Sequence, residues 1–440
     1  MLDVDGKPAA SSNDVKFSSD FEPLTPEVFE LIQRVHHRLI QETDLQSMAR
    51  LEPDRARHAV ETAVRTIISE LAPGLYGDER ERAVNGVLDE AIGLGPLEPL
   101  VGDASISEVM VNAPEEVYFE RDGVIYLSAL RFRDRDHILR IVDRIISPLG
   151  RRLDEASPYV DARLPDGSRV NVIIPPLVPK SPTLTIRKFR PDMYTMENLL
   201  SNNTLTQGLA DFLRTCVRLR LNTIISGGTG TGKTTLLNAL SAYIPGTERI
   251  ITIEDPNELK LQQRHVIAME ARPPNIEGRN EVTQRDLFRN SLRMRPDRII
   301  VGEVRGGEAF DMLQAMNTGH EGSLTTVHAN SARDALSRIE NMVLMAGLDL
   351  PVRAIREQMA SALHLVVQVA RFSDGQRRVT LISEITGMEA EIVTMQDLFR
   401  FEQTGVGDDG RIRGSLEATG IRPTFSDRLG LGAFAGGRWG

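Results

Sequence analysis

Cysteine is almost absent from this sequence, since Cys216 is the one cysteine among 440 residues. An intrachain disulfide and a zinc site built from several cysteines are therefore both excluded. No apolar run approaches the roughly 18 residues that a membrane-spanning helix needs, and residues 1–20 lack the apolar core of a signal peptide. We therefore expect a cytoplasmic protein that reaches a membrane only by docking onto other molecules.

An excess of positive charge is also missing. Lys and Arg together number 52 and Asp and Glu 62, which gives a formal net charge of −10. Because proteins that coat nucleic acid present excess positive charge, nucleic acid is not an expected partner, although local basic patches remain compatible with the composition. The 41% hydrophobic and 26% charged residues are typical of a globular protein, and the length allows two or three domains.

One glycine-rich stretch carries the clearest chemical signal. Residues 227–234 fit the pattern G-x-x-x-x-G-K-[ST] and lie between an apolar strand pattern at 221–226 and a helical pattern from 236 onward. Glycines let backbone N–H groups surround a phosphate at a helix N-terminus, where Lys233 reaches the β- and γ-phosphates and the Thr234 hydroxyl ligates Mg²⁺. The motif predicts an NTPase. The expected nucleotide-binding residues are Gly227, Gly228, Thr229, Gly230, Thr231, Gly232, Lys233, Thr234 and Thr235.

Two further strand patterns end in acidic residues, Glu254 and Glu303. Hydrolysis of a nucleoside triphosphate needs one carboxylate for the metal or its water and another to activate the attacking water. The stretch 298–303 has the form of a Walker B element, with Glu303 where the usual pattern has Asp. Asp255, which follows Glu254, suits a turn-capping role as well as a catalytic one.

The apolar pattern changes several times along the chain and predicts an order of domains. The histidines in the predicted bundle, His36, His37 and His58, are expected to be packed or solvated and not metal-bound, because no cysteine or carboxylate cluster accompanies them. The predicted segments are a disordered lead-in at 1–24, a three-helix bundle at 25–93, an α+β domain at 94–190, a linker at 191–204, an α/β domain at 205–407 and a loosely ordered tail at 408–440.

Four motifs together resemble a known family. In chain order they are the phosphate loop, Thr-Ile-Glu-Asp-Pro at 252–256, Gly-Glu-Val-Arg at 302–305 and a histidine-containing box at 318–330. This order is similar to that of the secretion ATPases of type II and type IV systems and of type IV pili. Within that superfamily, Arg-Pro-Asp-Arg at 295–298 and the wording of the histidine box most resemble the CpaF branch, which drives tight-adherence (Tad/Flp) pili. The resemblance spans roughly residues 90 to 400.

The resemblance implies an α/β fold in which a C-terminal RecA-like P-loop motor domain follows a PAS-like α+β domain and the helical bundle. It implies a homohexameric ring that holds ATP and Mg²⁺ between the PAS-like and motor domains. It also implies that Glu254 activates water, that Glu303 is the acid near Mg²⁺ and that His328 senses the γ-phosphate. For His320, a phosphate contact and a structural hydrogen bond are equally compatible with the motif.

Three arginines of the PAS-like domain, Arg163, Arg169 and Arg187, are candidates for clamping phosphate oxygens. The resemblance implies that they act partly across a subunit boundary as arginine fingers. The alternative is that they are solvated arginines on hairpin strands, which normally carry charge outward.

The function implied by the resemblance is a MgATP-hydrolysing motor that assembles or retracts a Tad/Flp pilus at the inner face of the cytoplasmic membrane, with inner-membrane platform proteins as partners. The nearest alternative is a type IV secretion or conjugation ATPase that exports protein or DNA. A nucleic-acid translocase is an alternative of another class, disfavoured by the acidic charge and the histidine box. The near-absence of cysteine counts against the type II branch, which often carries a four-cysteine zinc insertion.

Overall fold

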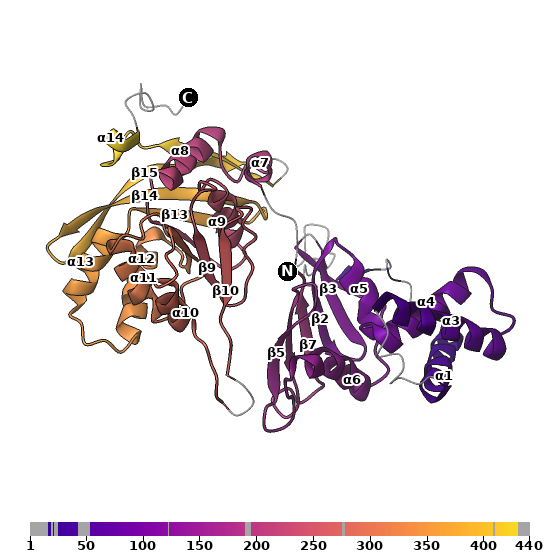
Figure 1. Cartoon of the computed structure of the whole chain (residues 1–440). Coiled ribbons are helices and arrows are strands. Elements are labelled where there is room, and N and C mark those ends of the chain that lie inside the picture. Colours follow the sequence, from indigo (N-terminus) through magenta and orange to yellow (C-terminus); the bar gives the residue numbers. More distant parts are fainter. Residues whose placement is uncertain are drawn as a thin grey trace. The chain divides into compact units, whose positions relative to one another are not determined.

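The structure is a computed structural model that describes residues 16–18, 21, 25–42, 53–121, 123–189, 195–274, 278–407 and 410–429. The chain divides into two compact units, Met1–Pro191 and Asp192–Gly440 (Figure 1). Each unit has its own sheet and its own buried apolar core. Within the described ranges, no helix is long and apolar enough to cross a membrane.

Three helices form the N-terminal part of the first unit, at the positions that the apolar spacing predicts. They are α1 (Pro26–Glu42), α3 (Pro53–Leu71) and α4 (Gly77–Ile92). Their apolar stripes meet in one cluster in which Val35, Val64 and Val84 are fully buried. Residues three and four apart lie on one face of a helix, so each stripe is covered by the other two helices.

A mixed sheet of seven strands makes up the rest of the first unit, in the order β1-β4-β3-β2-β7-β6-β5. Helix α6 (Arg135–Ile146) packs its apolar side, with Ile138 and Ile141 fully buried, into the core of this sheet. Two short helical segments, η1 (Gly95–Leu97) and α5 (Glu98–Gly102), precede β2, and η2 (Ser147–Leu149) follows α6. The strands are β1 (Lys16–Phe17), β2 (Ile106–Ala113), β3 (Glu116–Arg121), β4 (Val124–Leu127), β5 (Tyr159–Arg163), β6 (Arg169–Ile173) and β7 (Thr183–Arg187).

Part of the predicted disordered lead-in is ordered. Strand β1 pairs in parallel with β4, and Phe21 packs edge-on against Phe119 with 5.6 Å between the ring centroids. The backbone groups along the edge of β4 offer hydrogen bonds that a short segment can use even where its own apolar pattern is weak. The prediction for 1–24 is therefore wrong at the described positions, and the remainder of it lies outside the described residues.

A mixed sheet of nine strands organises the second unit, in the order β10-β9-β11-β12-β8-β13-β14-β15-β16. The strands from β10 to β13 are parallel, and β14, β15 and β16 continue the sheet antiparallel. The strand patterns predicted at 221–226, before Glu254 and before Glu303 each overlap an observed strand. The strands are β8 (Thr223–Gly227), β9 (Ile250–Glu254), β10 (Val266–Glu270), β11 (Arg298–Val301), β12 (Leu324–His328), β13 (Leu365–Arg371), β14 (Arg377–Glu389), β15 (Ile392–Val406) and β16 (Ile412–Ala418).

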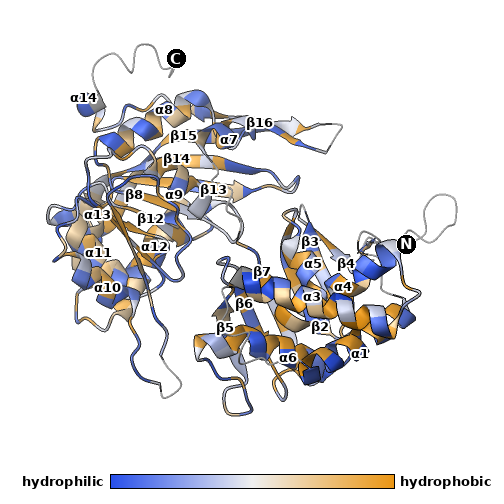
Figure 2. Ribbon diagram, turned by 45° about the vertical axis from the view of Figure 1, so that its right-hand side comes forward, coloured by the Kyte–Doolittle hydropathy of each residue, from blue (hydrophilic) through white to orange (hydrophobic). Residues whose placement is uncertain are grey.

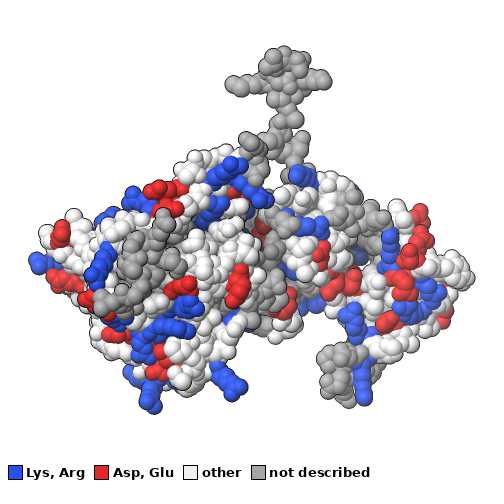
Figure 3. Space-filling model, turned by 90° about the horizontal axis from the view of Figure 1, so that it is seen from above, with Lys and Arg blue, Asp and Glu red and all other residues white. Residues whose placement is uncertain are grey.

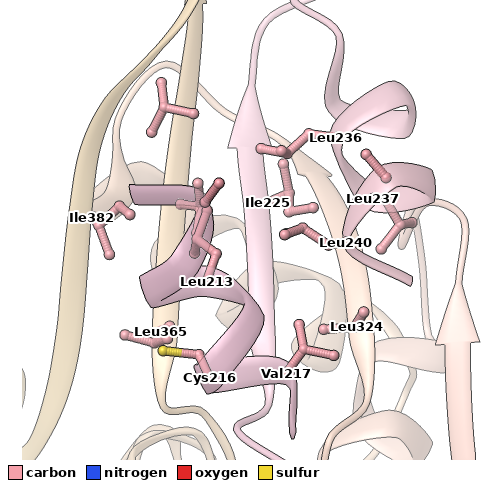
Figure 4. Close-up of a cluster of buried hydrophobic side chains, with 14 of the residues drawn as sticks. Leu213, Cys216, Val217, Ile225, Leu236, Leu237, Leu240, Leu324, Leu365 and Ile382 are labelled. Carbon is pink, nitrogen blue, oxygen red and sulfur yellow. The ribbon is translucent and has the colours of Figure 1, made fainter. Parts of the chain in front are cut away.

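Helices cover both faces of this sheet (Figure 2), and apolar side chains of its central strands are buried in a separate core on each face. On one face α7 (Met196–Ser201), α8 (Gln207–Arg218) and α9 (Lys233–Ser241) cover the strands, and Figure 4 shows residues of α8 and α9 against β8. The opposite face carries α10 (Gln284–Ser291), α11 (Glu308–Asn317), α12 (Ala332–Met345) and α13 (Val352–Ala362). All five residues of β8 are buried, which fixes the strand that leads into the phosphate loop.

Two segments predicted to be irregular are ordered. Within the predicted linker 191–204, residues 196–201 form α7, which begins with a capping box between Thr195 and Asn198, while 191–194 lie outside the described residues. In the predicted loose tail, β16 extends the sheet and Phe425 is buried beside Phe212 before the short helix α14 (Ser426–Leu429). Buried Glu384 accepts a hydrogen bond from Thr424 N at 3.0 Å. These long-range contacts order a segment whose local apolar pattern is weak.

Candidate active site

The phosphate loop lies between β8 and α9, as its sequence context predicts. Gly230 and Gly232 have φ angles of 69° and 92°, in the left-handed region that favours glycine. A Cβ atom on Gly227 would lie 2.5 Å from the Val369 carbonyl oxygen, so the loop also needs glycine where it passes β13. The backbone from Gly232 onward forms the N-terminus of α9, where free N–H groups attract anions.

Lys233 is buried within this loop and folds back onto it. Its ammonium group donates a hydrogen bond to the Gly228 carbonyl oxygen at 2.7 Å, and Thr231 Oγ1 donates to the same oxygen at 3.0 Å. The pKa of Lys233 is lowered by burial, and the nearby charge of Glu303 offsets only part of this effect. A buried cation held by one neutral carbonyl oxygen fits a site that receives phosphate.

A cluster of side chains lies at the carboxyl ends of the neighbouring strands. Glu303, just after β11, contacts His328 at the end of β12 with 3.0 Å between Oε1 and Nε2. Arg305 donates to the other oxygen of Glu303 from Nε at 2.9 Å and from Nη2 at 2.6 Å. Burial and the charge of Lys233 lower the pKa of His328, so its ring is neutral near pH 7.

Glu254 occupies a separate, buried position at the end of β9. Its Oε2 accepts hydrogen bonds from the backbone N–H groups of Glu258 and Leu259 at 2.8 and 2.9 Å, whereas the buried Oε1 has no protein partner among the described residues. A Cβ on Gly302 would lie 2.8 Å from Cγ of Glu254, so Gly302 makes room for this side chain. Burial raises the pKa of Glu254 to about 7, which suits a group that accepts a proton near neutral pH.

The three arginines predicted to clamp phosphate lie side by side in the first unit. Arg163, Arg169 and Arg187 are register partners across β5, β6 and β7, and Arg187 is also opposite Glu108 on β2. The Arg187 Nε atom is 3.4 Å from Glu108 Oε1, and the Arg187 side chain remains 58% exposed. Direct neighbours on antiparallel strands project from the same face, so this face carries a row of positive charge.

His320 lies far from the phosphate loop within the second unit. It precedes β12, whose first residue, Leu324, pairs with Thr223 at the start of β8, so it belongs to the edge opposite the loop. Ser323 Oγ donates a hydrogen bond to the His320 carbonyl oxygen at 2.9 Å. The position of His320 therefore does not support a phosphate contact within this unit, and its buried ring Nδ1 atom has no hydrogen-bond partner among the described residues.

The donor set fits ATP and a hard divalent cation. Lys233 and the N-terminus of α9 supply positive potential for phosphates. The Thr234 hydroxyl and the Glu303 carboxylate are oxygen ligands of the kind that Mg²⁺ prefers. A phosphate loop after a buried strand, with a histidine and a carboxylate at adjacent strand ends, defines the class as a P-loop ATPase.

Comparison with known proteins places the chain within that class. The pattern of the type II/IV secretion system protein family matches residues 90–405. The chain belongs to this family and is a secretion-system ATPase. The family match does not support the more specific assignment to the CpaF branch, and the relatives named below are conjugal transfer and type IV secretion proteins.

Two curated relatives align with this chain over nearly their full lengths. A Mycobacterium tuberculosis protein, whose name assigns it provisionally to conjugal transfer, is 38% identical over 325 residues, which are 72% of this chain and 92% of the relative. The type IV secretion system protein VirB11 of Bartonella quintana is 33% identical over 337 residues, covering 66% of this chain and 92% of the relative. The crystal structure of the pilus retraction motor PilT with ADP has a TM-score of 0.51 and 23% identity, covers 66% of this chain and 82% of PilT, and supports the fold alone.

Sequence reasoning missed two arginines of this site. Arg305 follows Glu303 by two residues, and the Gly-Glu-Val-Arg motif that contains it could have indicated its role. Arg377, on the β13–β14 hairpin, donates from Nε to the Gly230 carbonyl oxygen at 2.8 Å. Because Arg377 and Gly230 lie 147 positions apart in the sequence, no local pattern could have indicated this contact.

The raised pKa of Glu254 predicts a pH dependence of turnover. If Glu254 accepts a proton from water, kcat should rise with pH through about 7, because only the ionised carboxylate is a base. Glu254→Gln should bind MgATP, turn it over about 10²-fold more slowly and lose this limb. Initial rates at saturating MgATP between about pH 6 and pH 8 provide the measurement. An unchanged pH profile in the variant would remove Glu254 from proton transfer.

The raised pKa of Glu254 also makes the stability of the protein depend on pH. A carboxyl group whose folded pKa exceeds its unfolded value of 4.5 contributes most stability below pH 4.5, and this contribution is lost as the pH rises toward about 7. Glu254→Gln should therefore unfold at a higher temperature than the parent protein at pH 8, with a smaller difference at pH 5.

Proposed function

We propose that the chain is the ATP-driven motor of a type IV-class secretion machine that exports protein or DNA. The observation that carries the ATPase part is the contact between Glu303 and His328 beside the phosphate loop. The export part is supported by relatives named for conjugal transfer and type IV secretion, which align over about nine-tenths of their own lengths. The comparisons favour this reading over the pilus motor preferred from the sequence.

In this proposal, each residue of the candidate active site has a separate role. Lys233 would exchange its bond to the Gly228 carbonyl for the β- and γ-phosphates, at a site that already tolerates its charge. Thr234 and Glu303 would hold Mg²⁺, which neutralises charge on the phosphates. Neutral His328 would donate a hydrogen bond to the γ-phosphate, and Glu254 would orient water and accept its proton.

The proposal extends to a homohexamer in which a RecA-like motor domain and a PAS-like domain both contribute to each ATP site. The support is the row formed by Arg163, Arg169 and Arg187, which carries positive charge with Glu108 as one acidic neighbour. Arg169 and Arg187 would stabilise charge that develops on the leaving phosphate, within one subunit or across two. The machine's inner-membrane platform proteins would be its partners, at the inner face of the cytoplasmic membrane.

A Tad/Flp pilus motor is the second candidate. Its support is the wording of residues 295–298 and of the histidine box at 318–330, which resembles the CpaF branch. A nucleic-acid translocase is disfavoured by the net charge of −10. On the face drawn in Figure 3, acidic and basic groups are interspersed.

Glu303→Gln tests the proposed function in solution and in cells. The variant keeps the size of the side chain and removes its charge, so we expect MgATP binding with turnover reduced about 10²-fold or more. In a strain that depends on this gene, the variant should stop export while the protein remains present. Phosphate release with and without DNA, together with secretion or conjugation frequency, provides the measurements.

Glu357→Gln, at an exposed ion pair on α13, is the matched control and should behave like the parent protein. Normal export with lost pilus assembly would support the Tad/Flp candidate instead. Hydrolysis that requires DNA would favour a translocase, and unchanged hydrolysis in Glu303→Gln would contradict the ATPase site.

A further inference from the structure

Two arginines face each other beside the phosphate loop, on the hairpin that joins β13 and β14. Arg371 ends β13 and Arg377 begins β14, and the two are direct register partners. Val369 and Val379, the next pair on the same face, pack into the core that contains Leu236 of α9. The arginines therefore project on the side of the sheet where α9 and its phosphate loop lie.

Arg377 is in contact with the loop itself. Its Nε donates to the Gly230 carbonyl oxygen at 2.8 Å, and a Cβ on Gly232 would lie 3.4 Å from its Cδ. The two terminal nitrogens of Arg377, and the whole guanidinium of Arg371, have no hydrogen-bond or ion-pair partner within the described part of the chain. Both side chains are exposed, so these donors are accessible to a ligand.

Like charges directly opposite each other destabilise a sheet unless an anion compensates them. The hairpin's one carboxylate, Asp374, does not do so, because its oxygens accept from the backbone N–H groups of Gln376 and Ile412. The arrangement instead suits a phosphate, which a guanidinium binds through paired N–H groups.

The position of the arginine pair along the sheet indicates which phosphate of the nucleotide it would bind. Glu303 and His328, which the proposed function places at the γ-phosphate, follow or end β11 and β12 on one side of β8, whereas the hairpin follows β13 on the other side. We propose that Arg371 and Arg377 bind the phosphate of ATP or ADP that adjoins the nucleoside. This inference rests on the proposed ATP site at residues 227–235 and adds the opposite wall of that site.

The proposal predicts an effect on affinity. ATP and ADP share the phosphate next to the nucleoside, so both dissociation constants should rise together in variants of the pair. Loss of a charge-assisted hydrogen bond corresponds to a rise of about tenfold to a hundredfold for Arg377→Gln. We expect about tenfold for Arg371→Gln, with the effect falling on KM rather than on kcat.

Comparing the Arg371 and Arg377 variants distinguishes a role of positive charge in binding phosphate from a role in supporting the loop. Arg371 makes no hydrogen bond to the loop in the described part of the chain, so a role limited to holding Gly230 would leave Arg371→Gln without effect on ADP affinity. Removing one of two opposed charges should preserve or raise the Tm of the nucleotide-free protein, while the Tm increase on adding ADP shrinks. A purely structural arginine would show a lowered nucleotide-free Tm instead.

The experiment measures Kd for ADP and for a non-hydrolysable MgATP analogue, kcat, KM and Tm on the full chain. Arg413→Gln, an exposed arginine on β16, is the matched control and should retain the parent values. An unchanged ADP affinity in Arg371→Gln, or a fall in kcat without a change in affinity, would overturn the proposal. Lys233→Ala tests the site independently: if it weakens binding and the pair variants do not, this inference alone fails, whereas unchanged binding in all three contradicts the proposed ATP site.

Discussion

Replacing Lys233 with alanine is expected to abolish measurable ATP hydrolysis and to weaken MgATP binding. Lys233 is a buried cation at the N-terminus of α9, and its ammonium now bonds one carbonyl oxygen of the loop. Its removal would delete the positive charge that we propose contacts the β- and γ-phosphates in both the ground state and the transition state. Loss of one such preorganised donor lowers rates by about 10²- to 10³-fold, and the loss of affinity adds to this in kcat/KM.

Phosphate release by the purified protein and titration with a fluorescent ATP analogue measure both effects. Lys180→Ala removes an exposed lysine that pairs with Glu116 in the first unit, so it controls for the loss of one positive charge. Its hydrolysis rate should equal that of the parent protein. Parent-like hydrolysis in Lys233→Ala would place the reaction elsewhere in the chain.

Arg187→Ala is expected to remove most turnover while leaving MgATP affinity nearly intact. Arg187 lies in the middle of a four-strand row, between Arg169 and Glu108, and its side chain is largely exposed. An arginine that stabilises charge on the leaving phosphate acts mainly in the transition state and is worth about 10³ to 10⁵ in rate. Arg169→Ala should act in the same direction with a smaller effect.

Arg131→Ala, at an exposed loop position of the same unit, is the control and should retain full turnover. Mixing Arg187→Ala subunits with Lys233→Ala subunits distinguishes the two arrangements. Partial recovery of hydrolysis indicates that the arginine of one subunit serves the loop of another, and no recovery indicates action within one subunit. A near-normal rate for Arg187→Ala alone would remove this arginine from the mechanism.

The sequence predicted those parts of the fold that short-range patterns control. Strands buried on both faces, such as β8 and β9, appear as continuous apolar runs, and the glycine loop between β8 and α9 has a fixed spacing. Glu303 and His328 were each predicted near the phosphate, and the structure places them 3.0 Å apart because parallel strands end at one edge.

Long-range contacts account for what could not be predicted. Arg298 begins a strand and would be expected at the surface, yet it is fully buried because Glu248 and the carbonyl oxygens of Val217 and Gly322 accept its hydrogen bonds. Strand β16 depends on pairing with β15, and β1 depends on the edge of β4. Arg377 reaches the phosphate loop from a distant hairpin. None of these contacts leaves a periodic signal in its own segment.

The most direct test of the account is a structure of Glu303→Gln with MgATP, because this variant is expected to bind the nucleotide without consuming it. The account predicts the γ-phosphate within hydrogen-bonding distance of Lys233 Nζ and His328 Nε2, with the phosphate next to the nucleoside facing Arg371 and Arg377. Nucleotide bound with its γ-phosphate away from Lys233 and His328 would contradict the central claim that these residues form the ATP-hydrolysing site.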